Sequence, residues 1–171
     1  MKTILIAHNY DENSFAAMSC NLANHLADKG NRVVFISHKP YFNEIQTIKK
    51  QKGEIIICSW PTENRPTSLK DVFWYCRLYF KYKPDVVLGH FVGANIAISL
   101  SKLLSFNNTK TFNYYHTLTG QISADWRGSR LKSTLLRYRK SIFYRFFCDA
   151  IICPSDLAKE DLRINFNLKK V

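Results

Sequence analysis

Four of the five histidines in this sequence stand at the ends of short apolar runs, where an imidazole can donate or accept hydrogen bonds with a ligand. They are His8, His38, His90 and His116, and Ser155 follows a fifth run. Runs of three to five apolar residues, separated by helix-like stretches of twelve or more, indicate buried parallel strands joined by crossover helices. Ligands bind at the carboxyl edge of such a sheet, so the sequence predicts a site there.

The alternation of apolar runs and helical stretches predicts one doubly wound α/β array. Strands are expected at residues 3–8, 32–37, 54–58, 85–88, 110–115 and 149–153, and helices at 14–29, 68–82, 94–104 and from 155 onward. The polar segment 42–51 is expected to form a further helix. Gly30 and Pro84 should mark the ends of the helices before them, because glycine adopts left-handed conformations and the residue before a proline disfavours helix.

Length and composition exclude several classes of protein. A chain of 171 residues is long enough for one domain with a full core, and an apolar content of 46% excludes a disordered chain. No uncharged apolar stretch approaches the roughly 20 residues that span a bilayer. Met1 leads almost directly into the first strand, so we expect no signal peptide.

The cysteine and histidine patterns do not predict a metal site. The five cysteines are odd in number and lack C-x-x-C spacing, which indicates neither a disulfide framework nor a zinc site. The four histidines come from separate strands, without the H-x-x-x-H or carboxylate spacing of metal-binding motifs. We therefore expect no bound metal.

The net charge of +12 is concentrated between residues 127 and 145, which contain seven basic residues, no acidic residue, and interleaved leucine, isoleucine and phenylalanine. Three interpretations are open: a solvated helix face, a nucleic-acid-binding surface, or a helix that lies on an anionic membrane. No aromatic stacking platform or nucleic-acid-binding module is visible, so the membrane is favoured over nucleic acid. The residues expected at the lipid surface are Arg130, Lys132, Arg137, Arg139 and Lys140.

Four segments, in order, resemble the N-terminal domain of family 4 glycosyltransferases, which are retaining two-domain GT-B enzymes. The segments are N-L-A-N-H-L-A-D-K-G-N-R-V-V-F-I (21–36), K-P-D-V-V-L-G-H (83–90), Y-Y-H-T-L-T-G (114–120) and D-A-I-I-C-P-S-D-L-A-K-E-D-L (149–162). The resemblance implies a Rossmann-like parallel sheet of about six to seven strands over residues 1–171, the N-terminal half of a GT-B fold. It also implies that the C-terminal domain, which holds the nucleotide-sugar and carries an E-x7-E motif in the family, is absent from this chain.

The resemblance also implies roles for the residues after the later strands. In the family, the histidine at the place of His116 contacts the donor sugar, which makes His116 the candidate catalytic residue. Thr117 and Gly120 follow it in the same loop, and His90 lies at the equivalent edge of the preceding strand, where acceptor groups would lie. The other histidines are interpreted as structural: His8, His25 and His38.

The loop before the first helix departs from the family pattern. A Gly-Gly pair usually lies there and lets backbone amides approach a phosphate, whereas this chain has Asn13 and Ser14. Asparagine tolerates the left-handed conformation and serine caps helices well, so an anion could still bind. Asn9 and Tyr10 of the same loop are further candidates, and Ser155 is expected first as a helix N-cap and second as a phosphate contact.

The sequence is thus interpreted as the acceptor-side domain of a hexosyltransferase that moves a sugar from a nucleotide-sugar donor to an acceptor hydroxyl, on a polysaccharide or a lipid-linked molecule. The nucleotide-sugar is a substrate, and no cofactor, metal or nucleic-acid partner is expected. The enzyme should be cytoplasmic, peripheral on the inner face of the plasma membrane, and the isolated fragment inactive. Two alternatives remain: a stand-alone module that holds a nucleotide or phosphate without catalysis, and a basic surface-docking protein with a vestigial sheet edge.

Overall fold

The described residues form one seven-stranded sheet. The computed structural model describes residues 1–8, 14–37, 46–62, 68–90, 94–106, 108–116, 118–120 and 130–168, with the backbone alone at 14–16, 46, 130 and 132–133. The strands are β1 (Thr3–Ala7), β2 (Arg32–Ser37), β3 (Gln46–Lys49), β4 (Glu54–Ser59), β5 (Val86–His90), β6 (Lys110–Tyr114) and β7 (Ala150–Ile152). Their order is β3-β4-β2-β1-β5-β6-β7, and five of the six neighbouring pairs are parallel. The predicted α/β architecture with a mostly parallel sheet is confirmed.

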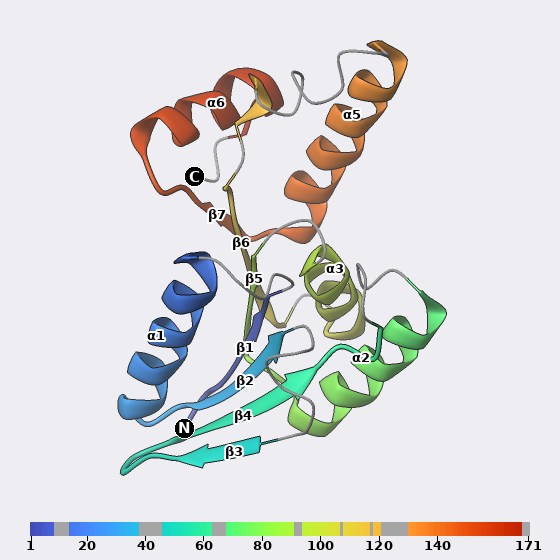
Figure 1. Cartoon of the computed structure of the whole chain (residues 1–171). Helices are drawn as coiled ribbons and strands as arrows, with labels where there is room; N and C mark the ends of the chain where they lie inside the picture. Colours follow the sequence, from blue (N-terminus) through green and yellow to red (C-terminus); the bar gives the residue numbers. More distant parts are fainter. Residues whose placement is uncertain are drawn as a thin grey trace.

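Helices cover both faces of this sheet. They are α1 (Ser14–Asp28), α2 (Leu69–Tyr82), α3 (Asn95–Leu104), α5 (Arg130–Phe147) and α6 (Asp156–Phe166), and Figure 1 shows α1 on one side of the sheet and α2 and α3 on the other. The two buried clusters agree with this view. Ala23 of α1 packs with Ile6, whereas Tyr75 of α2 and Ile98 of α3 belong to the cluster of Leu5. Leu5 and Ile6 face opposite sides because successive side chains alternate along a strand.

The predicted elements agree with the observed ones to within two residues at each end, except in one segment. The helix expected at 42–51 is wrong, because Gln46–Lys49 forms an edge strand, β3, antiparallel to β4. Lys50 N–H donates to the Gly53 carbonyl at 2.9 Å in the turn between the two strands. An edge strand has one side open to water and tolerates polar and charged residues, so the polarity of this segment did not exclude a strand.

Local signals set the ends of the helices. The Ser68 hydroxyl accepts a hydrogen bond from Asp71 N–H, and the Asp71 carboxylate accepts one from Ser68 N–H, so α2 begins with a complete capping box. Lys83 ends α2 with a φ of 43°, directly before Pro84. Gly30 follows α1 with a φ of 89°, as expected for a residue that ends a helix in the left-handed conformation.

Close packing of α3 against β5 fixes the backbone that carries His90. Gly89 precedes His90 in β5, and a Cβ added at Gly89 would lie 2.5 Å from Cδ1 of Ile98 in α3. Ile98 is fully buried, so its side chain has little space into which it could move. The absence of a side chain at Gly89 therefore lets α3 approach the carboxyl end of β5.

Candidate functional site

Three histidines from three neighbouring strands meet at the carboxyl edge of the sheet. His8 follows β1, His90 is the last residue of β5, and His116 lies two residues after β6. β1, β5 and β6 are adjacent and parallel, so their carboxyl ends lie side by side. The ring centroids of His8 and His90 are 5.7 Å apart, and those of His90 and His116 are 5.4 Å apart.

His90 and His116 are joined by a hydrogen bond and by stacking. Nδ1 of His90 lies 3.2 Å from Nε2 of His116. The Tyr114 ring stacks on His90 at 4.7 Å with an interplanar angle of 15°, and on His116 at 5.0 Å with 13°. The three rings thus form one compact stack in which His90 is completely buried.

Burial keeps both bonded imidazoles neutral. It lowers the pKa of His90 from 6.5 to about 3, with smaller contributions from His116 and His8. Burial, followed by the effect of His8, lowers the pKa of His116 to about 4. At neutral pH the pair can therefore act on a ligand through hydrogen bonds and not through positive charge.

His8 contacts α1, which covers the face of the sheet opposite to α2 and α3. Its ring is 1% exposed, and its Nδ1 lies 3.3 Å from the hydroxyl oxygen of Ser19 in α1. This burial agrees with the interpretation of His8 as a structural histidine. Its position beside His90 also makes it part of the wall of the site.

Sequence comparison assigns the chain to a known family. The model of Glycosyltransferase Family 4 matches residues 17–171. The chain belongs to glycosyltransferase family 4. No curated protein sequence matches it.

Similar solved structures support the fold of a family 4 domain. Sucrose-phosphate synthase from Thermosynechococcus elongatus matches with a TM-score of 0.66 and 14% identity over 96% of this chain and 45% of that one. A shorter form of the same protein matches with a TM-score of 0.61 and 16% identity over 95% and 81% of the two chains. A Listeria monocytogenes protein assigned as a UDP-N-acetylglucosamine 2-epimerase matches with a TM-score of 0.56 and 14% identity, over 95% and 42%. The chain thus spans less than half the length of sucrose-phosphate synthase.

A carboxylate from α6 holds the loop that follows His116 in this family 4 domain. Asp161 accepts hydrogen bonds from the Tyr115 hydroxyl at 2.5 Å, from Thr119 N–H at 2.9 Å and from the Thr119 hydroxyl at 2.8 Å. Burial raises the pKa of Asp161, but the hydrogen bonds from Tyr115 and Thr119 outweigh it and the net pKa is lowered. Sequence reasoning missed Asp161, because its place within segment 149–162 gave no sign that it would reach the loop after β6.

The other predicted site residues have different outcomes. Ser155 caps α6, as expected, by accepting a hydrogen bond from Ala158 N–H at 3.2 Å. Gly120 is exposed, and among the described residues other than its chain neighbours no heavy atom lies within 4 Å of the place that a Cβ would take, so these residues do not require glycine there. Ser14 begins α1, with its side chain outside the described part. The remaining candidates lie outside the described residues: Asn9, Tyr10, Asn13, His38 and Thr117.

No metal site is apparent among the residues that the structure describes, where no group of three or more histidine, cysteine, aspartate or glutamate side chains could hold an ion.

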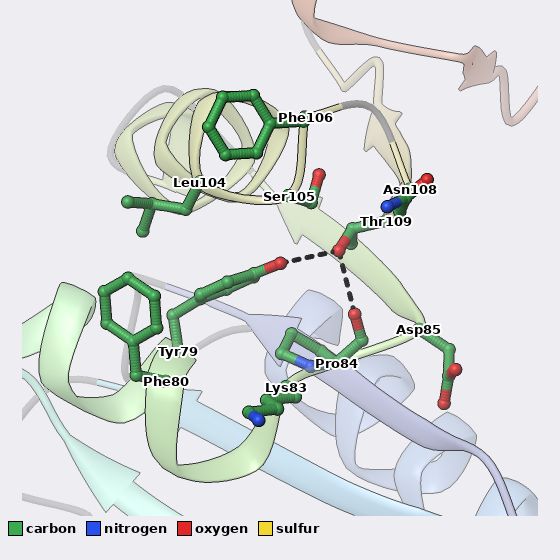
Figure 2. Close-up of a pocket in the computed structure, with 10 residues that line it drawn as sticks. All are labelled: Tyr79, Phe80, Lys83, Pro84, Asp85, Leu104, Ser105, Phe106, Asn108 and Thr109. Atoms are coloured by element: carbon green, nitrogen blue, oxygen red, sulfur yellow. Dashed lines mark hydrogen bonds between the residues drawn. The ribbon is translucent and has the colours of Figure 1, made fainter.

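A hollow of about 410 Å³ lies at the opposite, amino edge of the sheet (Figure 2). Its rim carries the apolar side chains of Phe80, Leu104 and Phe106, as Figure 2 shows. Beneath them, the Tyr79 hydroxyl bonds the Thr109 hydroxyl at 2.9 Å, which in turn donates to the Pro84 carbonyl at 3.0 Å. These buried polar groups therefore already bond one another beneath the hollow.

The basic segment forms α5, and an apolar stripe is exposed along it. The exposed residues occur at intervals of three and four, which places them on one face: Leu131, Leu135, Tyr138, Ile142 and Phe146. Phe143 and Tyr144 are buried and face the core. Within the described ranges, none of the helices is both long and apolar enough to cross a bilayer.

The predicted lipid-contacting residues of α5 are not equivalent. Arg137 and Arg139 are both exposed, and Arg137 donates a hydrogen bond to the Asn165 side chain of α6 at 3.0 Å. Lys140 is half-buried, and burial, followed by the nearby Arg139, lowers its pKa. Arg130 and Lys132 belong to α5, with side chains outside the described part.

Proposed function

We propose that this chain is the acceptor-side half of a GT-B hexosyltransferase, which transfers a sugar from a nucleotide-sugar donor to an acceptor hydroxyl. The observation that carries the proposal is the stack of His90, His116 and Tyr114 at the carboxyl edge of a family 4 domain. Ligands of open α/β sheets bind at this edge.

In this proposal His116 contacts the donor sugar and orients it. The neutral imidazole suits a sugar, because a hydroxyl group both donates and accepts hydrogen bonds and carries no charge. Catalysis would then depend on positioning and on fixed dipoles, and would need no metal or cofactor from the protein. The loop residues Asn9, Tyr10, Asn13, Ser14, Thr117 and Gly120, with His90 and Ser155, are proposed to complete the donor and acceptor contacts.

A second domain would complete the site. The chain covers 45% of sucrose-phosphate synthase, so about half of such a protein has no counterpart here. We propose that the complete enzyme carries a C-terminal domain with an E-x7-E motif, which holds the nucleotide and stabilises the leaving diphosphate. The 171-residue chain alone would then not transfer sugar.

The test is a matched pair of histidine substitutions in the complete enzyme. His116→Ala should lower kcat about 100-fold, which is typical of the loss of one positioned hydrogen-bonding group. His25→Ala is the control, because His25 is exposed on α1, and it should retain the wild-type rate. The assay measures transfer of labelled sugar from a panel of nucleotide-sugars to acceptors in a membrane extract. Nucleotide binding without transfer of any sugar would instead support the stand-alone binding module.

We further propose that α5 binds an anionic membrane surface and brings the cytoplasmic enzyme to a lipid-linked acceptor. The apolar stripe would enter the lipid interface, while basic residues such as Arg139 and Arg145 contact the headgroups. α5 contains no acidic residue, so its charge is complementary to anionic lipid along its whole length. Each basic residue near an anionic membrane surface contributes about 1 kcal/mol to the free energy of binding.

Sedimentation with lipid vesicles tests the membrane proposal. The chain should bind vesicles that contain phosphatidylglycerol and not vesicles of phosphatidylcholine alone. The double variant R139Q/R145Q should bind the anionic vesicles roughly tenfold or more weakly, from the loss of two such contacts. The control K29Q/K52Q removes the same charge from exposed residues outside α5 and should bind as the wild type does. Equal binding to both kinds of vesicle would refute the proposal.

A further inference from the structure

The outer side of α2 carries only large apolar and basic side chains. The exposed residues of this helix are Leu69, Lys70, Phe73, Arg77, Phe80 and Lys81. Leu69, Phe73 and Phe80 are 75%, 72% and 57% exposed, and intervals of four and seven residues place them along one side of the helix. The only acidic residue of α2, Asp71, is completely buried. The side of α2 that meets water is therefore apolar and positively charged.

The neighbouring helices continue this pattern. α3 contacts both α2 and α5, so the three helices adjoin one another. Leu103 of α3 is exposed, as is Phe106 just after this helix, and α5 adds its apolar stripe between Leu131 and Phe146. Neither α3 nor α5 contains an acidic residue. The exposed side chains of α2, α3 and α5 thus form an apolar and basic surface, which we call the α2–α3–α5 face.

The helix on the opposite side of the sheet lacks this pattern. Figure 1 shows α1 on one side and α2 and α3 on the other. Within its described part, α1 exposes Ala17, Asn21, His25 and Asp28. These side chains are small or polar, whereas the α2–α3–α5 face gathers large apolar groups from three adjoining helices. Single exposed apolar residues are ordinary, but such a gathering beside charged residues is typical of an interaction surface.

Charge complementarity identifies the partner. Lys70 and Arg77 take part in none of the ion pairs that the described residues form, so no described carboxylate neutralises them. An anionic lipid surface offers hydrocarbon to Leu69 and Phe73 and phosphate groups to the basic residues beside them. A second copy of this chain would instead bring a like charge, because the net charge is +12.

We propose that the α2–α3–α5 face as a whole, and not α5 alone, docks on an anionic membrane, with α1 directed away from the lipid. The inference rests on the proposed membrane contact of α5 and extends it to a second helix. Contacts from two helices of one domain reinforce each other, because the second contact forms without a further loss of translational freedom. They also fix the orientation of the domain, whereas a single helix can roll about its own axis on the surface.

Vesicle sedimentation of the 171-residue chain tests the contribution of α2. The variant K70Q/R77Q is matched to R139Q/R145Q, because each removes two exposed positive charges. It should bind phosphatidylglycerol vesicles roughly tenfold or more weakly, since each basic residue near an anionic surface raises the affinity about fivefold. L69Q/F73Q should also bind more weakly, because it removes apolar groups that would enter the lipid interface. K29Q/K52Q again serves as the control with wild-type binding. Wild-type binding by either α2 variant would overturn the proposal.

Two native cysteines report the orientation without any substitution. Cys76 of α2 and Cys20 of α1 are free and half-buried, and Cys76 lies three residues after Phe73 and four before Phe80, on the same side of the helix. A water-soluble maleimide is added with and without anionic vesicles, and mass spectrometry locates the modified thiols. Vesicles should slow modification of Cys76 several-fold and leave that of Cys20 unchanged.

Two results of the cysteine experiment would count against the proposal. An unchanged rate at Cys76 in the presence of bound vesicles would overturn it. Protection of Cys76 that rises with protein concentration, in the absence of vesicles, would show that a second copy covers α2, and would overturn it as well.

The paired variants separate failure of this inference from failure of the proposed function. If R139Q/R145Q loses vesicle binding and K70Q/R77Q does not, the membrane contact of α5 stands and the contribution of α2 falls. If K70Q/R77Q loses binding and R139Q/R145Q does not, α2 makes the contact and the proposed role of α5 falls. Loss of binding in both variants is the expected result. Sugar transfer is measured separately, so the assignment of His116 stands or falls independently of these outcomes.

Discussion

The two edges of the sheet differ in how their polar groups are paired within the described residues. At the amino edge, Asp149 accepts hydrogen bonds from Lys102, at 2.7 and 2.8 Å, and from Thr111 N–H at 2.8 Å. Asp85 likewise accepts from Thr3 N–H at 2.7 Å. At the carboxyl edge, several buried polar atoms have no hydrogen-bond partner among the described residues. They are the hydroxyls of Ser37 and Ser59, Nε1 of Trp60, Nε2 of His90 and Oδ1 of Asn113.

The contrast separates polar groups that are paired within the fold from polar groups that could bond a ligand. Buried polar atoms in proteins are nearly always paired, so the carboxyl-edge atoms that lack a partner among the described residues are candidates for hydrogen bonds with a ligand. At the amino edge, Asp85 and Asp149 are hydrogen-bonded to other described residues. Within the described residues, the edge with the histidines is therefore the one where a ligand would displace the fewest of the hydrogen bonds that the structure shows.

The largest expected effect concerns pH. The pKa values of His90 and His116, about 3 and 4, lie below the ordinary 6.5. The unfolded chain therefore binds protons below pH 6.5 that the folded chain does not bind, and stability must fall on acidification from about pH 6.5 toward pH 4. The free energy of unfolding should fall by up to about 1.4 kcal/mol per pH unit for each histidine. Urea denaturation at a series of pH values measures it. A stability that stays constant between pH 6.5 and 4.5 would show that the two rings are accessible to protons.

The next prediction tests the hydrogen bonds of Asp149 at the amino edge. Asp149→Asn removes the charge that pairs with Lys102 and weakens the bonds to Thr111, and should lower the free energy of unfolding by about 2–3 kcal/mol. Glu160→Gln is the matched control, because its pair with Arg163 is exposed and 3.7 Å long, and it should change stability by less than about 0.5 kcal/mol. Ligand binding at the far edge should be retained in both variants. Equal stability losses from the two would contradict the view that Asp149 holds the amino edge together.

The smallest effect concerns the carboxyl edge. Ser37→Ala and Ser59→Ala remove hydroxyls that have no partner among the described residues, so each variant should be as stable as the wild type or up to about 1 kcal/mol more stable. Chemical denaturation measures the change, with Thr111→Ala as the amino-edge comparison, because the Thr111 hydroxyl donates to the Phe147 carbonyl at 2.7 Å. A loss of more than about 1 kcal/mol in either serine variant would mean that the hydroxyl is bonded within the protein.

The sequence was sufficient to predict most of the sheet and the edge at which the histidines lie. Apolar runs identify buried strands, and parallel strands place their carboxyl ends together, so the common edge of His90 and His116 could be inferred without coordinates. The hydrogen bond between them could not, because it depends on β5 and β6 being neighbours in register, His90 with Tyr114. Strand order is set by packing of the whole chain and leaves no local signal.

Two other features could not be inferred, for different reasons. β3 was missed because a polar segment at the edge of a sheet obtains its stability from pairing with β4 and not from its own apolar pattern. The reach of Asp161 to Thr119 was missed because it joins residues 42 positions apart. Two of the three interpretations of the basic segment made it a helix, and it forms α5, but the half-buried Lys140 shows that charge alone does not tell which basic residues face outward.

The carboxylate of Asp161 has a mechanical consequence. It ties Tyr115 and Thr119, on either side of the loop after His116, to the middle of α6. A rotation or sliding of α6 by more than the tolerance of these bonds must either drag the loop along or break them. A displacement of α6 would therefore move Tyr115 and Thr119, and with them the residues beside His116.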